Sequence, residues 1–318
     1  MYNTIKTYLS EDWTAFIRQF ESSIVSSVPL MQTINEYLLS HKGKQLRPML
    51  CILSAKALTG QTNQNVIRCA ASAELLHMAT LLHDDVADNS DLRRGNPTVM
   101  AMYSPTSSVL VGDFWLSRAI RDITANCDRR TLLLFARCLE DLAEGEVFQL
   151  AKAESLDTTI EDYKHIIYCK TASLFIASVL SGAYSAGAYE DDCKKIESYA
   201  YHLGMSFQMM DDIFDYDPEV ASGKPYYQDI SERKMTIPLI GALADAAESE
   251  RESIKESLKN ADVEAVVSFV RQHKGIEYAY RILKEEIELA KSSLSSIPES
   301  DYKSFLMAIA DTMLSRRN

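Results

Sequence analysis

Two runs of acidic residues with the same spacing are the part of this chain most able to do chemistry. The first lies in LLHDDVADNSDLRRG, residues 81–95, and the second in FQMMDDIFDYD, residues 207–217. On an α-helix, residues four apart share a face, so the carboxylates of each run repel one another. Mg²⁺ removes that repulsion, because it accepts carboxylate oxygens and takes its remaining ligands from water and substrate phosphates. The candidate metal ligands are Asp84, Asp85, Asp88, Asp211, Asp212 and Asp215.

One such acidic run is weak evidence, because acidic clusters are common in acidic proteins. Two of them within apolar helical patterns are more specific, since carboxylates are rarely buried unless they are paired or bound to a metal. We therefore predict that the two acidic clusters face each other across one cavity and form a site for several metal ions and a diphosphate.

Basic residues at helix ends or beside apolar runs could bind the phosphate groups. A guanidinium is a permanently charged fork that matches phosphate oxygens, and charge-assisted contacts are about twice as strong as neutral ones. Each basic residue alone is more typical of a solvated surface charge. Together with the acidic clusters they supply what two bound diphosphates need. The candidates are Lys44, Arg47, Arg93, Arg94, Lys170, Lys224 and Lys234.

Composition excludes several other classes of protein. The net charge of −12 argues against a general nucleic-acid binder, because phosphate backbones attract basic surfaces. The six cysteines are scattered with no CxxC pair, which predicts core residues in a reducing cytosol rather than a zinc site or a disulfide framework. Glu11 and Asp12 stand where a signal peptide has its apolar core, and no apolar run reaches about 18 residues. We expect a cytoplasmic protein without a transmembrane segment.

Long helices must position these residues, because Gly and Pro are scarce, at 11 and 8 of 318 residues. A helix over residues 65–88 would carry Asp84 and Asp88 in its last turns, and a helix over 191–217 would carry the second acidic cluster. Residues 159–188 are nearly all apolar after Thr171, which predicts a helix buried on all sides. No strand pattern is convincing. The prediction is an all-α fold, one helical domain over residues 1–318 around a deep central cavity.

These motifs resemble, in order, those of the trans-isoprenyl diphosphate (polyprenyl) synthases. The resemblance runs from residue 43 to 241. It includes GKQLRP at 43–48, DDVAD with RRG, VGD at 111–113, GEVFQ at 145–149, KTASLF at 170–175, the second acidic run, and then GKP and KMTIP. It implies the isoprenoid synthase fold, a homodimer, and a prenyltransferase that adds isopentenyl diphosphate to an allylic diphosphate primer.

The resemblance also implies roles for single residues. Asp84, Asp88 and Asp211 would hold three Mg²⁺ ions on the allylic diphosphate, assisted by Asp85, Asp212 and Asp215. That diphosphate would be contacted by Arg93, Lys170, Lys224 and Lys234, and isopentenyl diphosphate by Lys44, Arg47, His77 and Arg94. Thr171 and Gln208 would line the reacting centre. Lys42, Tyr227 and Arg233 stand where the family has Gly, so we expect a changed lid over the diphosphate and unchanged metal ligands.

Product length should depend on Ala79 and Thr80, about one turn before Asp84. In the resembled family, aromatic residues at these positions form a floor that stops short chains. Both residues are small here, so we predict a channel that continues toward Leu76 and a long product, C30 or more. The alternative is a shorter farnesyl or geranylgeranyl product. A long lipid product also suggests peripheral association with a membrane.

Three other readings compete with chain elongation. A class I terpene cyclase or head-to-head synthase also uses aspartate-rich metal sites, but it has no need of the GKxLRP and RRG cations. A non-catalytic partner subunit of the same fold has no use for two sets of repelling carboxylates. Glu74 and His77 form an ExxH pair of the kind found in di-iron bundles, but the chain lacks the second pair that such a site requires.

Overall fold

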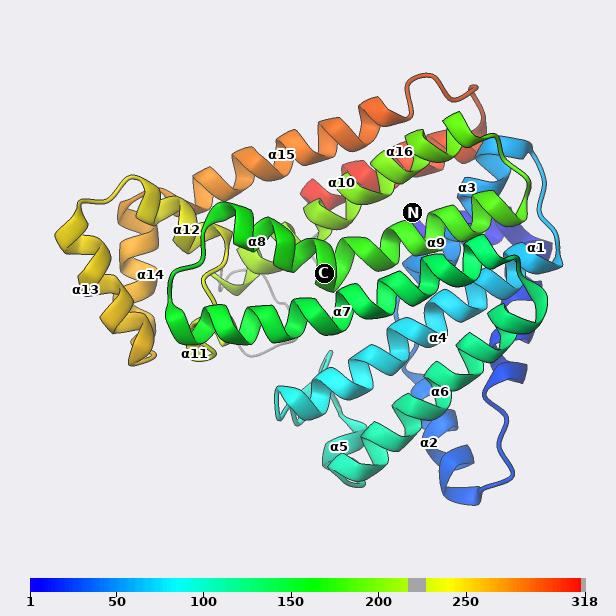
Figure 1. Cartoon of the computed structure of the whole chain (residues 1–318), viewed down its shortest axis with the longest axis horizontal. Helices are drawn as coiled ribbons and strands as arrows, with labels where there is room; N and C mark the ends of the chain where they lie inside the picture. Colours follow the sequence, from blue (N-terminus) through cyan, green and yellow to red (C-terminus); the bar gives the residue numbers. More distant parts are fainter. Residues whose placement is uncertain (217–226, 316–318) are drawn as a thin grey trace. The chain divides into compact units, whose positions relative to one another are not determined.

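The computed structural model describes residues 1–216 and 227–315, and its described residues are almost entirely helical (Figure 1). The all-α prediction is confirmed. The strands β1 (Leu92–Arg93) and β2 (Asn96–Pro97) form one short antiparallel hairpin. The helical elements are α1 (Tyr2–Ser23), α2 (Pro29–Ser40), α3 (Leu46–Thr59), α4 (Gln64–Ala87), α5 (Val99–Met102), α6 (Pro105–Asn126), α7 (Arg129–Ser155), α8 (Ile160–Ile167), the π-helical turn η1 (Tyr168–Ala172), α9 (Ser173–Ser185), α10 (Glu190–Asp215), α11 (Gln228–Ser231), α12 (Ile237–Ala244), α13 (Glu248–Lys259), α14 (Val263–Gln272), α15 (Gly275–Ser293) and α16 (Asp301–Ser315).

The chain divides into two compact units. Unit 1 contains Met1–Arg137, Leu174–Glu197 and Ser296–Met307, and unit 2 contains Cys138–Ser173, Ser198–Ser295 and Ala308–Asn318. The first acidic cluster belongs to unit 1 and the second to unit 2. Both the single domain over residues 1–318 and its deep central cavity stay predictions.

In unit 1, α4 packs against α6, α3 and α1 (Figure 1). Asn63 begins α4, because its side chain accepts hydrogen bonds from the backbone N–H groups of Asn65 and Val66. The helix ends at Ala87, and Asp88 is its C-cap, with its N–H still donating to the carbonyl of Asp84 at 2.8 Å. The predicted helix over 65–88 is therefore right to within one residue at each end.

A buried hydrogen-bond relay holds α2 against α6 in the same unit. The indole N–H of Trp115, which is fully buried, donates to Asn35 Oδ1 at 2.8 Å. The side-chain amide of Asn35 donates in turn to the carbonyl of Ile24 at 2.6 Å. Both polar groups are satisfied inside an apolar core, so these bonds fix the position of α2 against α6.

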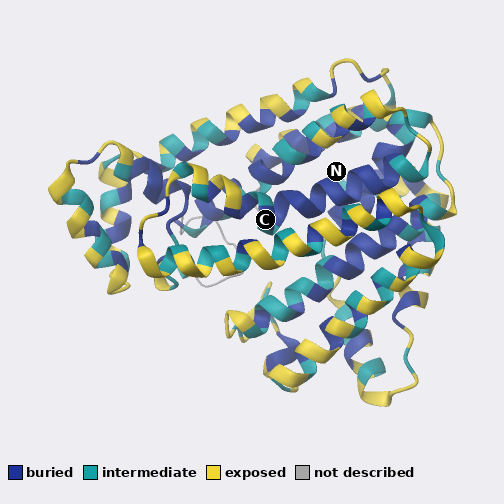
Figure 2. Cartoon of the chain, in the orientation of Figure 1, coloured by how far each residue is buried: buried dark blue, intermediate teal, exposed yellow. Residues whose placement is uncertain are grey.

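Residues 160–185 are interrupted where the sequence predicts one continuous helix. The π-helical turn η1 separates α8 from α9 and carries Lys170 and Thr171. This segment has the length and apolarity of a membrane span, but 89% of its most apolar window is buried within the protein. Figure 2 shows α9 as almost wholly buried. The prediction of all-round burial is confirmed for α9, whereas α8 exposes Glu161, Lys164 and His165.

Candidate functional site

The first acidic cluster stands at the C-terminal end of α4. Asp84 is half-buried, Asp85 is buried and Asp88 is exposed. Asp85 is held by Arg93, whose Nε donates to Asp85 Oδ1 at 2.6 Å. This charge-assisted bond fixes both side chains. Asp85 is therefore committed to Arg93. The shared face predicted for Asp84 and Asp88 stays a prediction, because Asp88 is the C-cap of α4.

A tight hairpin places the next arginine. Arg93 pairs with Asn96 across β1 and β2, and the two residues between them, Arg94 and Gly95, both have positive φ, at 53° and 76°. A two-residue turn of this kind needs the left-handed conformation at both positions, which Gly95 adopts without strain. Arg94 therefore lies at the tip of the hairpin, immediately beyond the arginine that binds Asp85.

The connector before α3 meets this hairpin. Gly43 lies so close to Arg94 that a Cβ at Gly43 would stand 2.1 Å from Arg94 Nη1. Arg47, in the first turn of α3, is buried, and its guanidinium stacks over the Phe175 ring at 5.0 Å. Unit 1 thus brings together Arg47 and Arg94, two cations that are 47 residues apart in sequence and that the resemblance assigns to isopentenyl diphosphate.

His77 belongs to the same cluster. Burial, together with the positive charges of Arg47, Arg94 and Arg93, lowers the pKa of His77 well below its usual value. The imidazole is therefore neutral at pH 7 and can both donate and accept a hydrogen bond. Its proximity to these arginines agrees with the placement expected from the sequence, and its role in substrate binding stays a prediction.

Glu74 and Lys6 complete this cluster, and neither was predicted from the sequence to take part in it. Glu74 is only 4% exposed, and among the described residues its Oε2 has no hydrogen-bond partner. Burial raises the pKa of Glu74, against the opposing influence of Arg47, Arg94 and Lys6. Lys6 of α1 donates to Gln45 Oε1 at 3.2 Å. The ExxH spacing of Glu74 and His77 was the only feature of the sequence that pointed to Glu74. In the structure, Glu74 is a buried carboxylate among cations, not half of a di-iron site.

The second acidic cluster, on α10 in unit 2, is part of a continuous hydrogen-bond chain. The Thr171 hydroxyl donates to Gln208 Oε1 at 2.6 Å, and Gln208 Nε2 donates to Asp212 Oδ1 at 2.8 Å. The other oxygen of Asp212 accepts from the Tyr163 hydroxyl at 2.6 Å. Burial, with the charges of Asp229 and Asp211, raises the pKa of Asp212 to about 8 despite these two donors. Asp212 therefore keeps its proton at pH 7 in this structure, and a cation that binds the carboxylate would displace that proton.

Asp215 has a structural partner in the chain that follows. Its two carboxylate oxygens accept the backbone N–H groups of Gln228 and Asp229, each at 3.0 Å, at the start of α11. The preceding residue, Tyr227, has φ of +62°, and Arg233 has φ of +59°. These are two of the positions where the resembled family has Gly. Their left-handed backbone gives the physical reason, since only Gly adopts it without strain.

The π-helical turn η1 is held between close-packed helices. A Cβ at Gly145 of α7 would stand 2.3 Å from the Cβ of Cys169, and a Cβ at Gly204 of α10 would stand 2.5 Å from the Cα of Ala172. The GEVFQ motif therefore contacts η1 in two ways. Gly145 allows close packing against Cys169, and Glu146 forms an ion pair with Lys170 at 2.8 Å. A π-helical turn often marks a functional site, because it reorients the side chains of one turn.

A cavity of about 60 Å³ in unit 2 gathers four of the residues predicted for this half of the site. Its lining includes Lys170, Gln208, Asp212 and Lys234, together with Tyr163, which the sequence did not single out. Lys234 is paired with Glu232. Lys224 falls in residues 217–226, outside the described part of the chain.

Ala79 and Thr80 differ in their surroundings. Ala79 is 1% exposed, whereas Thr80 is half-buried and its hydroxyl donates to the carbonyl of His77 at 2.8 Å. Gly112 of α6 lies against this turn of α4, because its Cβ would stand 3.2 Å from the Ala79 carbonyl. Their effect on chain length stays a prediction, and Thr80 has more room for a larger side chain.

The donor chemistry fits Mg²⁺. The candidate ligands are all carboxylates, the hard oxygen donors that Mg²⁺ prefers. Within residues 1–216 and 227–315, no three His, Cys, Asp or Glu side chains gather as a ready metal site. That agrees with the usual behaviour of Mg²⁺, which takes one or two carboxylates from a protein and the rest from substrate phosphates and water. The facing of the two acidic clusters involves both units and stays a prediction.

Comparisons with known proteins identify relatives along almost the whole chain. The model of the polyprenyl synthetase family matches residues 28–272. The octaprenyl diphosphate synthase of Haemophilus influenzae is 37% identical over 90% of this chain and 88% of its own. A decaprenyl diphosphate synthase from Rhodobacter capsulatus superposes with a TM-score of 0.94 at 33% identity, covering 100% of both chains. A Caulobacter crescentus polyprenyl synthase, complexed with calcium and isoprenyl diphosphate, gives 0.92 at 31%, covering 100% of this chain and 98% of that one.

Proposed function

The chain belongs to the polyprenyl synthetase family, and we propose that its two acidic clusters and their cations catalyse head-to-tail condensation of isopentenyl diphosphate onto an allylic diphosphate. The protein is a prenyltransferase of the long-chain trans-polyprenyl type. The observation that carries the site assignment is the Thr171–Gln208–Asp212–Tyr163 hydrogen-bond chain, which borders the same cavity as Lys170 and Lys234.

Unit 2 is proposed to bind the allylic diphosphate. Lys170 and Lys234 would contact its phosphate oxygens, exchanging their ion pairs with Glu146 and Glu232 for the substrate. Lys224 is proposed for the same role. The hydrogen-bond chain through Gln208 orients the Asp212 carboxylate, and the fixed orientation of a ligating carboxylate strengthens metal binding.

Magnesium would be held by Asp84, Asp88 and Asp211, with Asp85, Asp212 and Asp215 assisting, and we propose three ions per active site. When bound, Mg²⁺ supplies Lewis-acid stabilisation of the departing diphosphate. Arg93, anchored by Asp85, adds a fixed positive charge for the same diphosphate.

Unit 1 is proposed to bind isopentenyl diphosphate through Lys44, Arg47 and Arg94, with the neutral imidazole of His77 beside them. The allylic C–O bond breaks, the isopentenyl double bond attacks the allylic cation, and a proton passes to the released diphosphate. The protein positions the two substrates and excludes water from the cation. The product is five carbons longer and is itself allylic, so the cycle repeats.

A homodimer is proposed from the outward face of α6. Leu116 and Ile120 line a shallow groove of that helix, and Leu110, near the start of α6, is 57% exposed. The spacing of four residues places Leu116 and Ile120 on one helix face, as in a helix-to-helix contact. Sedimentation of the Ile120→Asp variant should show a monomer. We also propose a cytoplasmic location with peripheral membrane association during product release.

The reaction is tested by incubating the purified chain with Mg²⁺, isopentenyl diphosphate and an allylic primer, then chromatographing the products. We expect elongation to C30 or more, abolished in Asp84→Ala and Asp211→Ala and retained in Asp191→Ala, the same change at an exposed aspartate in the first turn of α10. Diphosphate release from the primer without isopentenyl diphosphate would instead indicate a cyclase. A complete lack of product would indicate a partner subunit and would overturn the proposal.

A further inference from the structure

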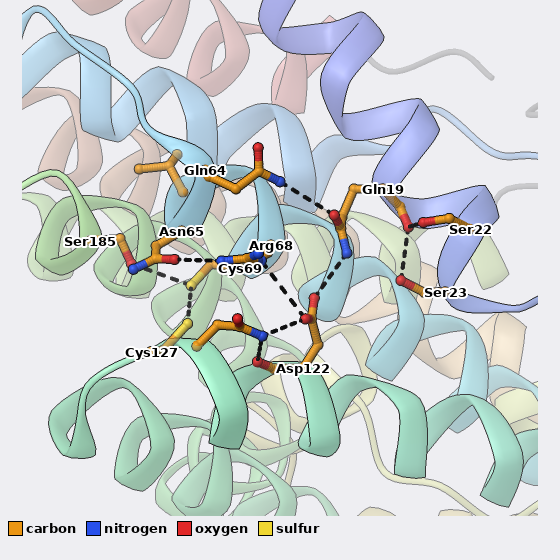
Figure 3. Close-up of polar contacts among 12 residues, drawn as sticks. Gln19, Ser22, Ser23, Gln64, Asn65, Arg68, Cys69, Asp122, Cys127 and Ser185 are labelled. Atoms are coloured by element: carbon orange, nitrogen blue, oxygen red, sulfur yellow. Dashed lines mark hydrogen bonds and ion pairs between the residues drawn. The ribbon is translucent and has the colours of Figure 1, made fainter.

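Two thiols lie side by side in unit 1, away from every residue assigned above. Cys69 is on α4, and Cys127 immediately follows α6. Their Sγ atoms are 3.6 Å apart, facing each other (Figure 3). Cys69 is fully buried and also lies 3.4 Å from the Ser185 hydroxyl, whereas Cys127 is partly exposed. The pair therefore has one thiol that solvent can reach and one that it cannot.

The two thiols differ in acidity. The hydrogen bond from Cys69 lowers the pKa of Cys127, and Arg68 also lowers it, against burial and the charges of Asp122 and Asp128. The same hydrogen bond and burial raise the pKa of Cys69 well above its usual value. Cys127 is therefore the nucleophilic thiol and Cys69 the one that keeps its proton. A reachable, acidified thiol beside a second thiol is the arrangement found in peroxide-sensitive cysteine pairs.

A polar network surrounds the pair and holds its two segments (Figure 3). Arg68 Nη1 donates to Asn65 Oδ1 at 3.1 Å, and its Nε lies 3.9 Å from Asp122 Oδ1. Asp122 also accepts hydrogen bonds from Gln19 and Asn126, at 3.1 and 2.9 Å. This network keeps α4 and the end of α6 in place and gives a small polar oxidant a polar approach to Cys127.

We propose that Cys69 and Cys127 are a modification site that hydrogen peroxide converts to an intramolecular disulfide. The Cys127 thiolate attacks one peroxide oxygen, the O–O bond breaks, and the second oxygen leaves as water, so Cys127 becomes a sulfenic acid. The Cys69 sulfur then attacks the Cys127 sulfur, the S–O bond breaks, and a second water leaves. Two thiols are oxidised, one peroxide is reduced to two waters, and a dithiol reductant reverses the change.

The sulfur atoms need to approach by about 1.6 Å to reach the S–S bond length of about 2.0 Å. Cys127 is well placed for such a shift, because it is the C-cap of α6, and side-chain rotation there disturbs no interior helical turn. In a reducing compartment, a disulfide of this kind is transient and reports on oxidants rather than stabilising the fold.

Peptide mass spectrometry tests the proposal on the full chain. The reduced protein is treated with hydrogen peroxide, unfolded, alkylated and digested without reductant. We expect a Cys69–Cys127 cross-linked peptide lacking two hydrogens, at least ten-fold less alkylation at these two residues, and full recovery after dithiothreitol. The matched control Cys138→Ser should form the same cross-link, whereas Cys69→Ser should leave Cys127 as a sulfenic acid that dimedone traps.

Three results would overturn the proposal. One is equal alkylation of all six cysteines after peroxide treatment, and another is a cross-link of Cys127 to Cys51 in place of Cys69. The third is oxidation of Cys127 to a sulfinic acid while Cys69 stays free in the unmodified chain. Each of these is read from the natural sequence, so the test stands even if a serine variant does not fold.

Discussion

Tyr163 provides the sharpest test of the site in unit 2, because it touches a predicted metal ligand without being one. Its hydroxyl donates to Asp212 Oδ2 at 2.6 Å inside the protein, and Tyr163→Phe removes that donor while keeping the ring. A hydrogen bond to the ionised form of Asp212, the form that would bind a metal, contributes about 1.5–3 kcal/mol. Loss of a group that orients a metal ligand costs roughly 10–100-fold in metal affinity, or about 1.4–2.8 kcal/mol. The free energy of the hydrogen bond and the free energy of the expected loss in metal affinity are therefore of the same size.

We therefore expect Tyr163→Phe to raise the Mg²⁺ concentration for half-maximal activity by roughly 10–100-fold, with much of the rate recovered at saturating Mg²⁺. The assay is incorporation of labelled isopentenyl diphosphate across a Mg²⁺ titration. Tyr168→Phe is the matched control, since the Tyr168 hydroxyl donates at 3.2 Å to Asp141, a carboxylate outside both clusters. An unchanged Mg²⁺ dependence in Tyr163→Phe, or an equal shift in Tyr168→Phe with both variants folded, would refute the reasoning.

Three further outcomes follow from unit 1. Glu74→Ala should lower the free energy of unfolding by roughly 3 kcal/mol, because it leaves the buried guanidinium of Arg47 without its counter-charge, and isopentenyl diphosphate should restore part of that loss in thermal melts; an equal loss with and without ligand would contradict this. The lowered pKa of His77 means that the unfolded chain binds a proton that the folded chain does not, so stability should fall as the pH drops below about 6.5. Denaturant unfolding at pH 7.5 and 5.5 should show a smaller fall in His77→Gln, and an identical fall would exclude this cause. Thr80→Phe and Ala79→Phe should both shorten the product, and Ala79→Phe should also cost more stability. An unchanged product distribution in folded Thr80→Phe would show that these residues do not form the floor that limits chain length.

Local sequence was sufficient to predict the helices that carry the acidic clusters, because apolar periodicity is a short-range signal. The helix over 65–88 and the placement of Asp84 and Asp88 are accurate to one residue. The break in the apolar segment at 168–172 was missed, because a π-helical turn has no periodicity of its own and is stabilised by its neighbours. The contacts of Gly145 and Gly204 with that turn, which come from two other helices, became apparent only in the structure.

The types of residue and their order along the chain were enough to predict the family and the reaction, and to show that the candidate metal ligands are hard oxygen donors. Tertiary structure decided how those residues divide their work. Asp85, Asp212 and Asp215 are each committed to a partner, respectively Arg93, Tyr163 with Gln208, and the start of α11. Some residues could be assigned a role only from neighbours distant in sequence. They are Glu74, Tyr163 and the Cys69–Cys127 pair. The reason is physical: a carboxylate's charge and a thiol's acidity depend on burial and on nearby dipoles, and only the fold determines those.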